Sequence, residues 1–162
     1  MNKMTAKFLI VALTFTLTAC GFQLRGAAQI DPTLNPMTIE SVQSGSALLP
    51  PLRRALVDAG VNLEGSPRST LLILEDEMGQ RVAAVSAQGR PREMELSYRV
   101  AFEIHGEGGI LLERRTLTLS REFAVDERDI LGKSQEAEVL RAGLVRDMVA
   151  ALVRQVAAVR QQ

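Results

Sequence analysis

Residues 93–104 read Glu-Met-Glu-Leu-Ser-Tyr-Arg-Val-Ala-Phe-Glu-Ile, and this stretch decides the fold. Every second residue from Met94 to Ile104 is large and apolar, while most residues between them are charged or polar. Successive side chains of a strand point to opposite faces, so this period of two predicts a strand with one buried face. Each large apolar side chain contributes about 1.5–3 kcal/mol when buried, so this face can anchor a core. The face comprises Met94, Leu96, Tyr98, Val100, Phe102 and Ile104.

Further strands are predicted on both sides of that stretch. Glycines within residues 106–109 indicate a hairpin turn, and residues 110–123 then form the returning strand. Upstream, residues 37–41 alternate apolar and polar side chains, and residues 70–85 are rich in residues that favour strands. Gly79 interrupts the second of these segments, and we expect a bend or bulge there.

Two helices complete the pattern. The first begins with Pro50 and Pro51 in its opening turn, is capped or preceded by Ser46, and ends at Gly60. The second follows a loop over residues 124–132 and begins near Ser134, with an apolar stripe that continues to Val159. The order strand, helix, three strands, helix predicts an α+β fold, with two helices packed on one face of a mixed four-stranded sheet. The exposed face of this sheet is expected to carry Glu93, Glu95 and Arg99.

The amino-terminal residues have the pattern of an export signal. Lys3 and Lys7 precede a run of about ten mostly apolar residues, which is too short to span a bilayer core of roughly 30 Å. Leucine, two small residues and Cys20 follow, a sequence that resembles a bacterial lipobox, in which the cysteine thiol receives a lipid. We therefore expect a signal over residues 1–19, a lipidated tether over residues 20–36 and a single domain over residues 37–162. The alternative is a soluble secreted protein with one stray cysteine.

In lipoproteins of this kind, the residue after the cysteine determines to which membrane the protein is sorted. Gly21 stands where an aspartate would resemble an inner-membrane retention signal, so the sequence resembles one addressed to the outer membrane. Two or more acyl chains on Cys20 would make a stable membrane anchor.

The composition excludes several classes of function. Without residues 1–19 the chain has 17 basic and 19 acidic side chains, and this near balance argues against nucleic-acid binding. The single cysteine excludes an internal disulfide and a cysteine metal site. Acidic runs at residues 75–77 and 126–129 lack the spacing of a calcium loop, so no metal or cofactor is expected. His105 is the only histidine, and no nucleophile has a credible base partner, so we expect binding or assembly and no catalytic residues.

The chain resembles the LptE family of lipopolysaccharide-assembly lipoproteins. The resemblance rests on Cys20-Gly21-Phe22-Gln23-Leu24-Arg25-Gly26, on the strand pattern around Tyr98, and on Leu131-Gly132-Lys133-x-x-Glu136. It implies two helices on a four-stranded sheet, in agreement with the pattern above. It also implies a plug within the lumen of the outer-membrane barrel LptD, which supports barrel assembly and binds lipopolysaccharide on its way to the cell surface.

The resemblance also implies where lipopolysaccharide is bound. Lys133 falls on the lysine of the family's lipopolysaccharide contacts, and the family's second basic position falls near Ala87, which does not match it. Arg90 and Arg92 lie close by, and we expect them to supply the missing positive charge. Guanidinium groups can grip a phosphate of lipid A in a fork, whereas lysine acts as a point charge. The alternative for Lys133 is a plain surface lysine.

Two other classes of function stay open. An auxiliary lipoprotein of a lipid-transport complex, without a barrel partner, would present an apolar groove, whereas a barrel plug would present a mostly polar outer surface. A small lipid-anchored hydrolase would need a nucleophile and a base in one cleft, for which the single histidine offers little.

Overall fold

The computed structural model describes residues 30–125 and 130–159, with side chains from residue 136 onward in the second range. Three long strands dominate it: β2 (Ser69–Val85), β3 (Pro91–Gly106) and β4 (Gly109–Ala124). Each pairs antiparallel with the next, and Tyr98 of β3 lies between Met78 of β2 and Leu119 of β4. The stretch 93–104 is therefore the central part of a sheet, and the predicted strand and hairpin are confirmed.

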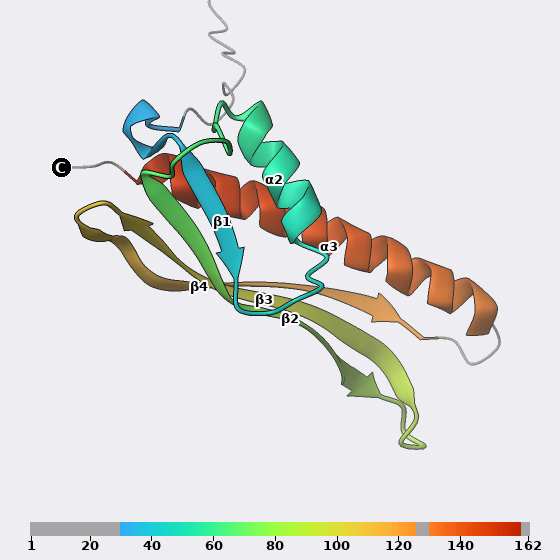
Figure 1. The fold of residues 1–162 in the computed structure, drawn as a ribbon. Coiled ribbons are helices and arrows are strands. Elements are labelled where there is room, and N and C mark those ends of the chain that lie inside the picture. Colours follow the sequence, from blue (N-terminus) through green and yellow to red (C-terminus); the bar gives the residue numbers. More distant parts are fainter. Residues whose placement is uncertain (1–29, 126–129, 160–162) are drawn as a thin grey trace, which may run out of the picture.

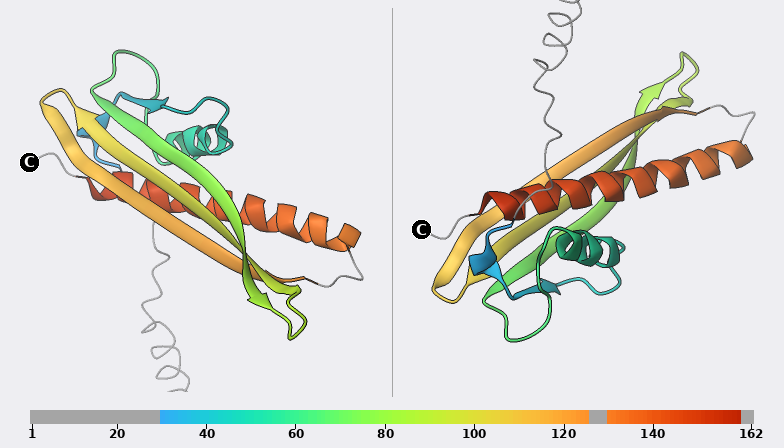
Figure 2. Two further views of the ribbon diagram at one scale, coloured as in Figure 1. Left: turned by 90° about the horizontal axis from the view of Figure 1, so that it is seen from below. Right: turned by 90° about the horizontal axis from the view of Figure 1, so that it is seen from above.

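The remaining elements complete a mixed sheet with two helices. Strand β1 (Met37–Ser41) pairs parallel with the first residues of β2, so the strand order is β1-β2-β3-β4. Helix α2 (Leu49–Asp58) connects β1 to β2, and helix α3 (Ile130–Ala158) follows β4. Both helices lie on the same face of the sheet (Figures 1 and 2). The predicted α+β fold is confirmed.

The core lies between that face and the two helices. It takes the alternating face of β3, the start of β2, and the inward stripes of α2 and α3. Alternation with a period of two on the strands and of about 3.6 on the helices brings these side chains together. The largest fully buried side chains are Leu34, Met37, Leu48, Leu52, Leu56, Leu71, Ile73, Leu96, Phe102, Ile104, Leu144 and Met148.

Helix α2 is short and begins and ends as its sequence predicts. Pro50 and Pro51 occupy its first turn, where a missing N–H costs nothing. Gly60 follows its last turn with a φ of 90°, a left-handed conformation that favours glycine. Ser46 precedes the helix and does not cap it, because the N-cap residue is Leu48 and no side chain bonds the first turn. The Ser46 hydroxyl accepts a 3.1 Å hydrogen bond from the N–H of Leu48 itself.

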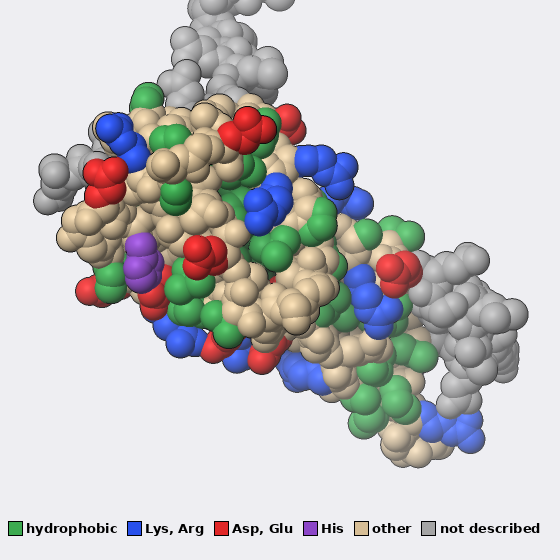
Figure 3. Space-filling model, viewed as in Figure 1, with side chains coloured by type: hydrophobic (Ala, Val, Ile, Leu, Met, Phe, Trp, Pro, Cys, Tyr) green, Lys and Arg blue, Asp and Glu red, His purple; other side chains and the backbone are tan. Residues whose placement is uncertain are grey.

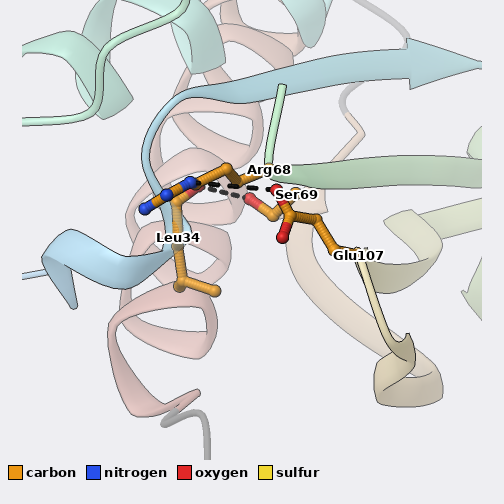
Figure 4. Close-up of polar contacts among 4 residues, drawn as sticks. All are labelled: Leu34, Arg68, Ser69 and Glu107. Carbon is orange, nitrogen blue, oxygen red and sulfur yellow. Dashed lines mark hydrogen bonds and ion pairs between the residues drawn. The ribbon is translucent and has the colours of Figure 1, made fainter. Parts of the chain in front are cut away.

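Residues 30–36, which belong to the predicted tether, contribute to the core. A short 3-10 helix, η1 (Pro32–Leu34), buries Leu34, and Ile30 is also buried. The hydroxyl of Ser69, itself buried, donates a 2.6 Å hydrogen bond to the carbonyl of Leu34 (Figure 4). Beside it, Arg68 and Glu107 form an exposed ion pair at 3.8 Å. The hydrogen bond between Ser69 and Leu34 attaches this segment to the start of β2, while the division of the chain into signal, tether and domain stays a prediction.

Two expectations about element details are wrong. The bulges of β2 lie between Ile73 and Glu75 and near Val82 to Val85, whereas Gly79 pairs regularly with Ser97. A Cβ on Gly79 would lie 3.2 Å from the Ser97 Oγ, so this glycine marks a close approach between strands. Helix α3 begins at Ile130, four residues before Ser134. Gly132 favours a loop, but a glycine destabilises a helix by only about 1 kcal/mol relative to alanine. The remaining interactions of a 29-residue helix outweigh this destabilisation.

Candidate functional site

The turn between β2 and β3 holds Arg90 at one end of the sheet. The N–H of Ser86 donates to the carbonyl of Arg90 at 2.7 Å, and the N–H of Arg90 donates to the Ser86 hydroxyl at 3.2 Å. Gly89, with a φ of 77°, allows the chain to reverse between them. The backbone position of Arg90 is therefore fixed by a closed ring of local hydrogen bonds.

Arg92 lies two residues further on, at the start of β3. Its carbonyl accepts a 2.8 Å hydrogen bond from the N–H of Val125, just beyond β4. The chain therefore leaves β4 directly beside Arg92 on its way to α3. This contact brings the two segments that carry the predicted basic residues to the same end of the molecule.

A cavity of about 950 Å³ opens at this end. Arg90 and Arg92 supply its positive charge and Glu93 its negative charge. The remaining lining is uncharged and includes Val85, Pro91 and Val125. Two guanidinium groups beside an open, partly apolar cavity can bind a phosphate without burying a charge.

Lys133 lies in the opening turn of α3, whereas the sequence predicts that it lies just before the helix. Its side chain is outside the described residues. The backbone places this turn at the same end of the molecule as the β2–β3 turn (Figures 1 and 2). The structure thus brings Arg90 and Arg92 into one cavity, and it places Lys133 at the same end.

Cys20 lies outside the described residues, so its lipidation stays a prediction. Among the described helices, none combines the length and the apolar character that a membrane crossing requires.

Several arginines elsewhere in the sheet also make intramolecular contacts. On the sheet face away from the helices, Arg81 pairs with Glu95 and Arg114 pairs with Glu75. On the helix side, Arg121 of β4 pairs with Asp147 of α3, and Arg115 donates to the Gln155 amide oxygen at 2.9 Å. The ion pairs and hydrogen bonds of these arginines link the strands of the sheet to one another and link β4 to α3.

The sheet face away from the helices is polar. Its middle carries Ser97 and Arg99 of β3, whose partners on β4 are Ser120 and Thr118. Glu93 and Arg99 are exposed there and Glu95 is half-buried, which agrees with the face predicted for them. Hydroxyl and charged groups therefore cover this surface without a large apolar patch.

Sequence reasoning missed a polar network between β2, β3 and the loop before α2. Asp76 lies within an acidic run that the sequence indicates is solvated, yet its carboxylate accepts hydrogen bonds from the Tyr98 hydroxyl at 2.7 Å and from Ser46. Burial, the hydrogen bond to Asp76 and the charge of Asp76 raise the pKa of Tyr98 well above its usual range. No local pattern signals this network, because Asp76 is out of phase with buried Leu71 and Ile73 and reaches the same face only through the bulge between Ile73 and Glu75.

His105 and the two acidic runs are the remaining candidates from the sequence. His105 contacts Glu103 at 2.9 Å and is 40% exposed, at a strand end beside glycines as predicted. Within residues 30–125 and 136–159, no three histidine, cysteine or acidic side chains gather as metal ligands would. The acidic residues 126–129 lie outside the described part of the chain.

Comparisons with known proteins agree on one family. A family model described as "LptE: Lipopolysaccharide-assembly" matches residues 33–156. The chain is 28% identical over 151 residues to the LPS-assembly lipoprotein LptE of Yersinia enterocolitica, covering 90% of this chain and 72% of that protein.

Solved structures of lipoproteins share the fold. An uncharacterized lipoprotein B from Nitrosomonas europaea is 25% identical, with a TM-score of 0.73 over 85% of this chain and 91% of that one. A minor lipoprotein from Acinetobacter baumannii is 22% identical, with a TM-score of 0.66 over 80% of this chain and 98% of that one.

Proposed function

Because this chain belongs to the LptE lipopolysaccharide-assembly family, we propose that it is an outer-membrane lipoprotein that binds lipopolysaccharide and supports an LptD-like barrel. Acyl chains on Cys20 anchor it, and its domain lies on the periplasmic side or within the lumen of the barrel. It needs no cofactor and acts by binding, without catalysis. The observation that carries the proposal is the family match over nearly the whole described domain.

The polar sheet face supports a barrel partner. A plug inside a barrel lumen meets polar side chains and water, so its outer surface must be polar. Such a surface is provided by Ser97, Ser120 and Thr118. The ion pairs Arg81–Glu95 and Arg114–Glu75 lie on the same face. The same face would be a poor surface for a lipid.

The cavity at Arg90 and Arg92 supports lipopolysaccharide binding. The phosphates of lipid A are anions, and guanidinium groups bind phosphate through short, charge-assisted hydrogen bonds. Lys133 adds a third positive charge at this end of the molecule. Exposed ion pairs contribute only about 0–1 kcal/mol each, so binding must rest on several cations together.

Charge reversal at this end tests the proposal. Every core residue in the part of the chain that the structure describes lies between Ile30 and Val159, so the chain from Gly21 onward keeps that core and can be used in solution. Changing Arg92 alone to Glu should weaken lipopolysaccharide binding about fivefold or less. Changing Arg90, Arg92 and Lys133 together to Glu should weaken it at least about tenfold, and more at low salt, where screening is weaker.

The matched control reverses the same amount of charge elsewhere. Arg54, Arg146 and Arg154 are exposed on the two helices, and changing all three to Glu alters the net charge equally. This control should bind lipopolysaccharide nearly as the parent does, and circular dichroism should show that both triple variants fold. Equal losses in the two variants would mean that net charge alone governs binding and would remove the proposed site.

A further inference from the structure

The outer edge of β4 is long and regular. Among the residues that the structure describes, β4 pairs only with β3 and lies at the far end of the sheet from β1 (Figure 2). Its pairing with β3 is regular from Arg115 to Ala124, and this stretch contains no proline, lysine or bulge. Proteins usually protect such an edge, because unpaired N–H and C=O groups pair readily with another strand. This edge is therefore a candidate surface for pairing with a further strand.

The other edges of the sheet are closed or short. On the outer side of β1, the N–H of Met37 donates a 2.9 Å hydrogen bond to the carbonyl of Asn62. The carbonyl of Ile39 on the same side accepts a 3.1 Å hydrogen bond from Arg53 of α2. The part of β2 that extends beyond β1, after Ile73, has a bulge at each end. A second strand therefore finds its longest regular edge on β4.

The ladder between β3 and β4 shows which backbone groups of β4 point outward. The N–H of Val125, just beyond β4, donates to the carbonyl of Arg92, so these two residues form a hydrogen-bonded pair. Such pairs alternate along a regular antiparallel ladder, and successive residues of a strand turn their backbone groups to opposite sides. The N–H and C=O groups of Thr116, Thr118 and Ser120 therefore point away from β3.

We propose that this chain forms a dimer in which β4 pairs antiparallel with β4 of a second copy, about a two-fold axis at Thr118. Thr118 faces Thr118 of the second copy, and Thr116 of each copy faces Ser120 of the other. Each of these pairs exchanges two backbone hydrogen bonds, so the two sheets become one. The dimer requires neither lipopolysaccharide nor a barrel.

Charges on the sheet face away from the helices favour this register. Side chains of both signs line that side of the molecule (lower border of Figure 3). In the dimer, Arg114 of each copy faces Glu122 of the other. Glu122 is exposed and lies opposite the like-charged Glu95 of β3, which already pairs with Arg81, so a cation stabilises Glu122 best from the free side of β4. The Arg114 side chain contacts Glu75 on the same face and is 53% exposed, which leaves it open to a second carboxylate.

The helix side of β4 is compatible with the same pairing. Leu117 of each copy faces Leu119 of the other, and both side chains are half-buried in the monomer. Arg115 faces Arg121 of the second copy, but both guanidinium groups are bonded to α3. Because Asp147 neutralises Arg121, these like charges oppose the dimer only weakly.

Proline substitutions test which edge forms the dimer. Thr118→Pro removes an N–H that points away from β3, so it should leave the fold intact and block pairing with a second copy. The matched control is Gln80→Pro, because Gln80 lies on the part of β2 beyond β1 and also turns its N–H away from β3. Sedimentation of the chain from Gly21 onward, between about 1 µM and about 1 mM, measures the dimer. Thr118→Pro should weaken it at least about tenfold, while Gln80→Pro leaves it as in the parent.

Charge exchange tests the register. Glu122→Arg creates two like-charged pairs with Arg114 and should weaken the dimer at least about fivefold, and more at low salt. Adding Arg114→Glu restores two opposite-charged pairs and should return the dimer to within about twofold of the parent. Glu64→Arg, in the exposed loop before β2, changes the net charge equally and should have no effect.

Several outcomes would overturn the proposal. One is a parent that stays monomeric over the whole concentration range. Another is a folded Thr118→Pro variant that dimerises like the parent, or a Gln80→Pro variant that loses as much. A double exchange that does not restore the dimer would contradict the register. Circular dichroism shows whether each variant folds, and if Thr118→Pro does not fold, Glu122→Arg and its rescue by Arg114→Glu decide the result.

Discussion

Tyr98 is the only tyrosine of the chain, and it occupies the middle of the central strand. It is 2% exposed, and its hydroxyl donates to Asp76, which in turn holds Ser46 of the loop before α2. A hydrogen bond to a charged group contributes about 1.5–3 kcal/mol. One phenol therefore joins β3, β2 and the start of α2 through a single carboxylate.

The raised pKa of Tyr98 predicts a loss of stability at high pH. In the unfolded chain the phenol ionises near pH 10, whereas in the folded chain it stays protonated well above that pH. The unfolded state therefore releases this proton first, and the free energy of unfolding should fall as the pH rises above about 10. Chemical denaturation across this range measures the slope.

Tyr98→Phe separates this effect from other titrating groups. The variant should be less stable than the parent by about 1–3 kcal/mol at pH 7, because the Asp76 carboxylate loses a donor. Its stability should depend less on pH above 10, so the difference between the two proteins narrows there. An identical slope in both proteins would show that another group is responsible.

Cys20 is the predicted attachment point of the lipid. We expect mass spectrometry of the mature amino-terminal peptide to find a diacylglyceryl group on its thiol and an acyl group on the new amine. Cys20→Ala should abolish both modifications and leave the signal attached. An unmodified Cys20, or cleavage elsewhere in the chain, would refute the lipobox interpretation.

Helix α2 depends on the sheet because a ten-residue helix is marginal alone. Within this helix, Leu56 is fully buried, whereas its neighbour Val57 is 53% exposed. Leu56→Ala should lower the free energy of unfolding by about 2–5 kcal/mol, since it leaves a cavity in the core. Val57→Ala should change it by less than about 0.5 kcal/mol. Denaturant midpoints measure both, and equal effects would mean that α2 is not docked as described.

The strands and helices were predictable because each carries a long apolar period. The six alternating apolar residues in 93–104 are enough by themselves to specify β3. Pro50 and Pro51 mark the start of α2, and Gly60 marks its end. The start of α3 was not predictable, because Gly132 indicates a loop on local preference and the rest of a 29-residue helix overrides it. The bulges of β2 were also hidden, since strand register depends on partners that are distant in sequence.

The candidate site was predictable only in part. The sequence pointed to Arg90 and Arg92 through a resemblance, and the structure adds the cavity that they share. The Asp76 network gave no local signal, because Asp76 turns to the helix side of the sheet only after the bulge between Ile73 and Glu75.

At the scale of the whole molecule, different functions are assigned to different surfaces. The polar sheet face would meet the barrel, the basic end would meet the lipid, and the predicted tether over residues 20–36 would connect the domain to its anchor. An auxiliary lipid-transport lipoprotein could use the basic end but would have no use for the polar face. The two classes of function therefore differ in whether a barrel partner exists.

Depletion of the protein in cells distinguishes these classes. If it supports an LptD-like barrel, depletion should lower the amount of correctly assembled barrel and make cells leakier to large hydrophobic drugs. Immunoblots of the assembled barrel and drug sensitivity measure the two effects. Unchanged barrel levels and permeability would favour the auxiliary lipoprotein.

Co-purification of the native lipoprotein from outer membranes tests the central claim most directly. The protein is extracted under mild conditions through a tag at its carboxyl end, and its partners are identified by mass spectrometry and by an assay for lipid A. We predict one dominant partner, an LptD-like barrel in equal amount, together with lipopolysaccharide. Purification without a barrel, from a membrane in which that barrel is present, would contradict it.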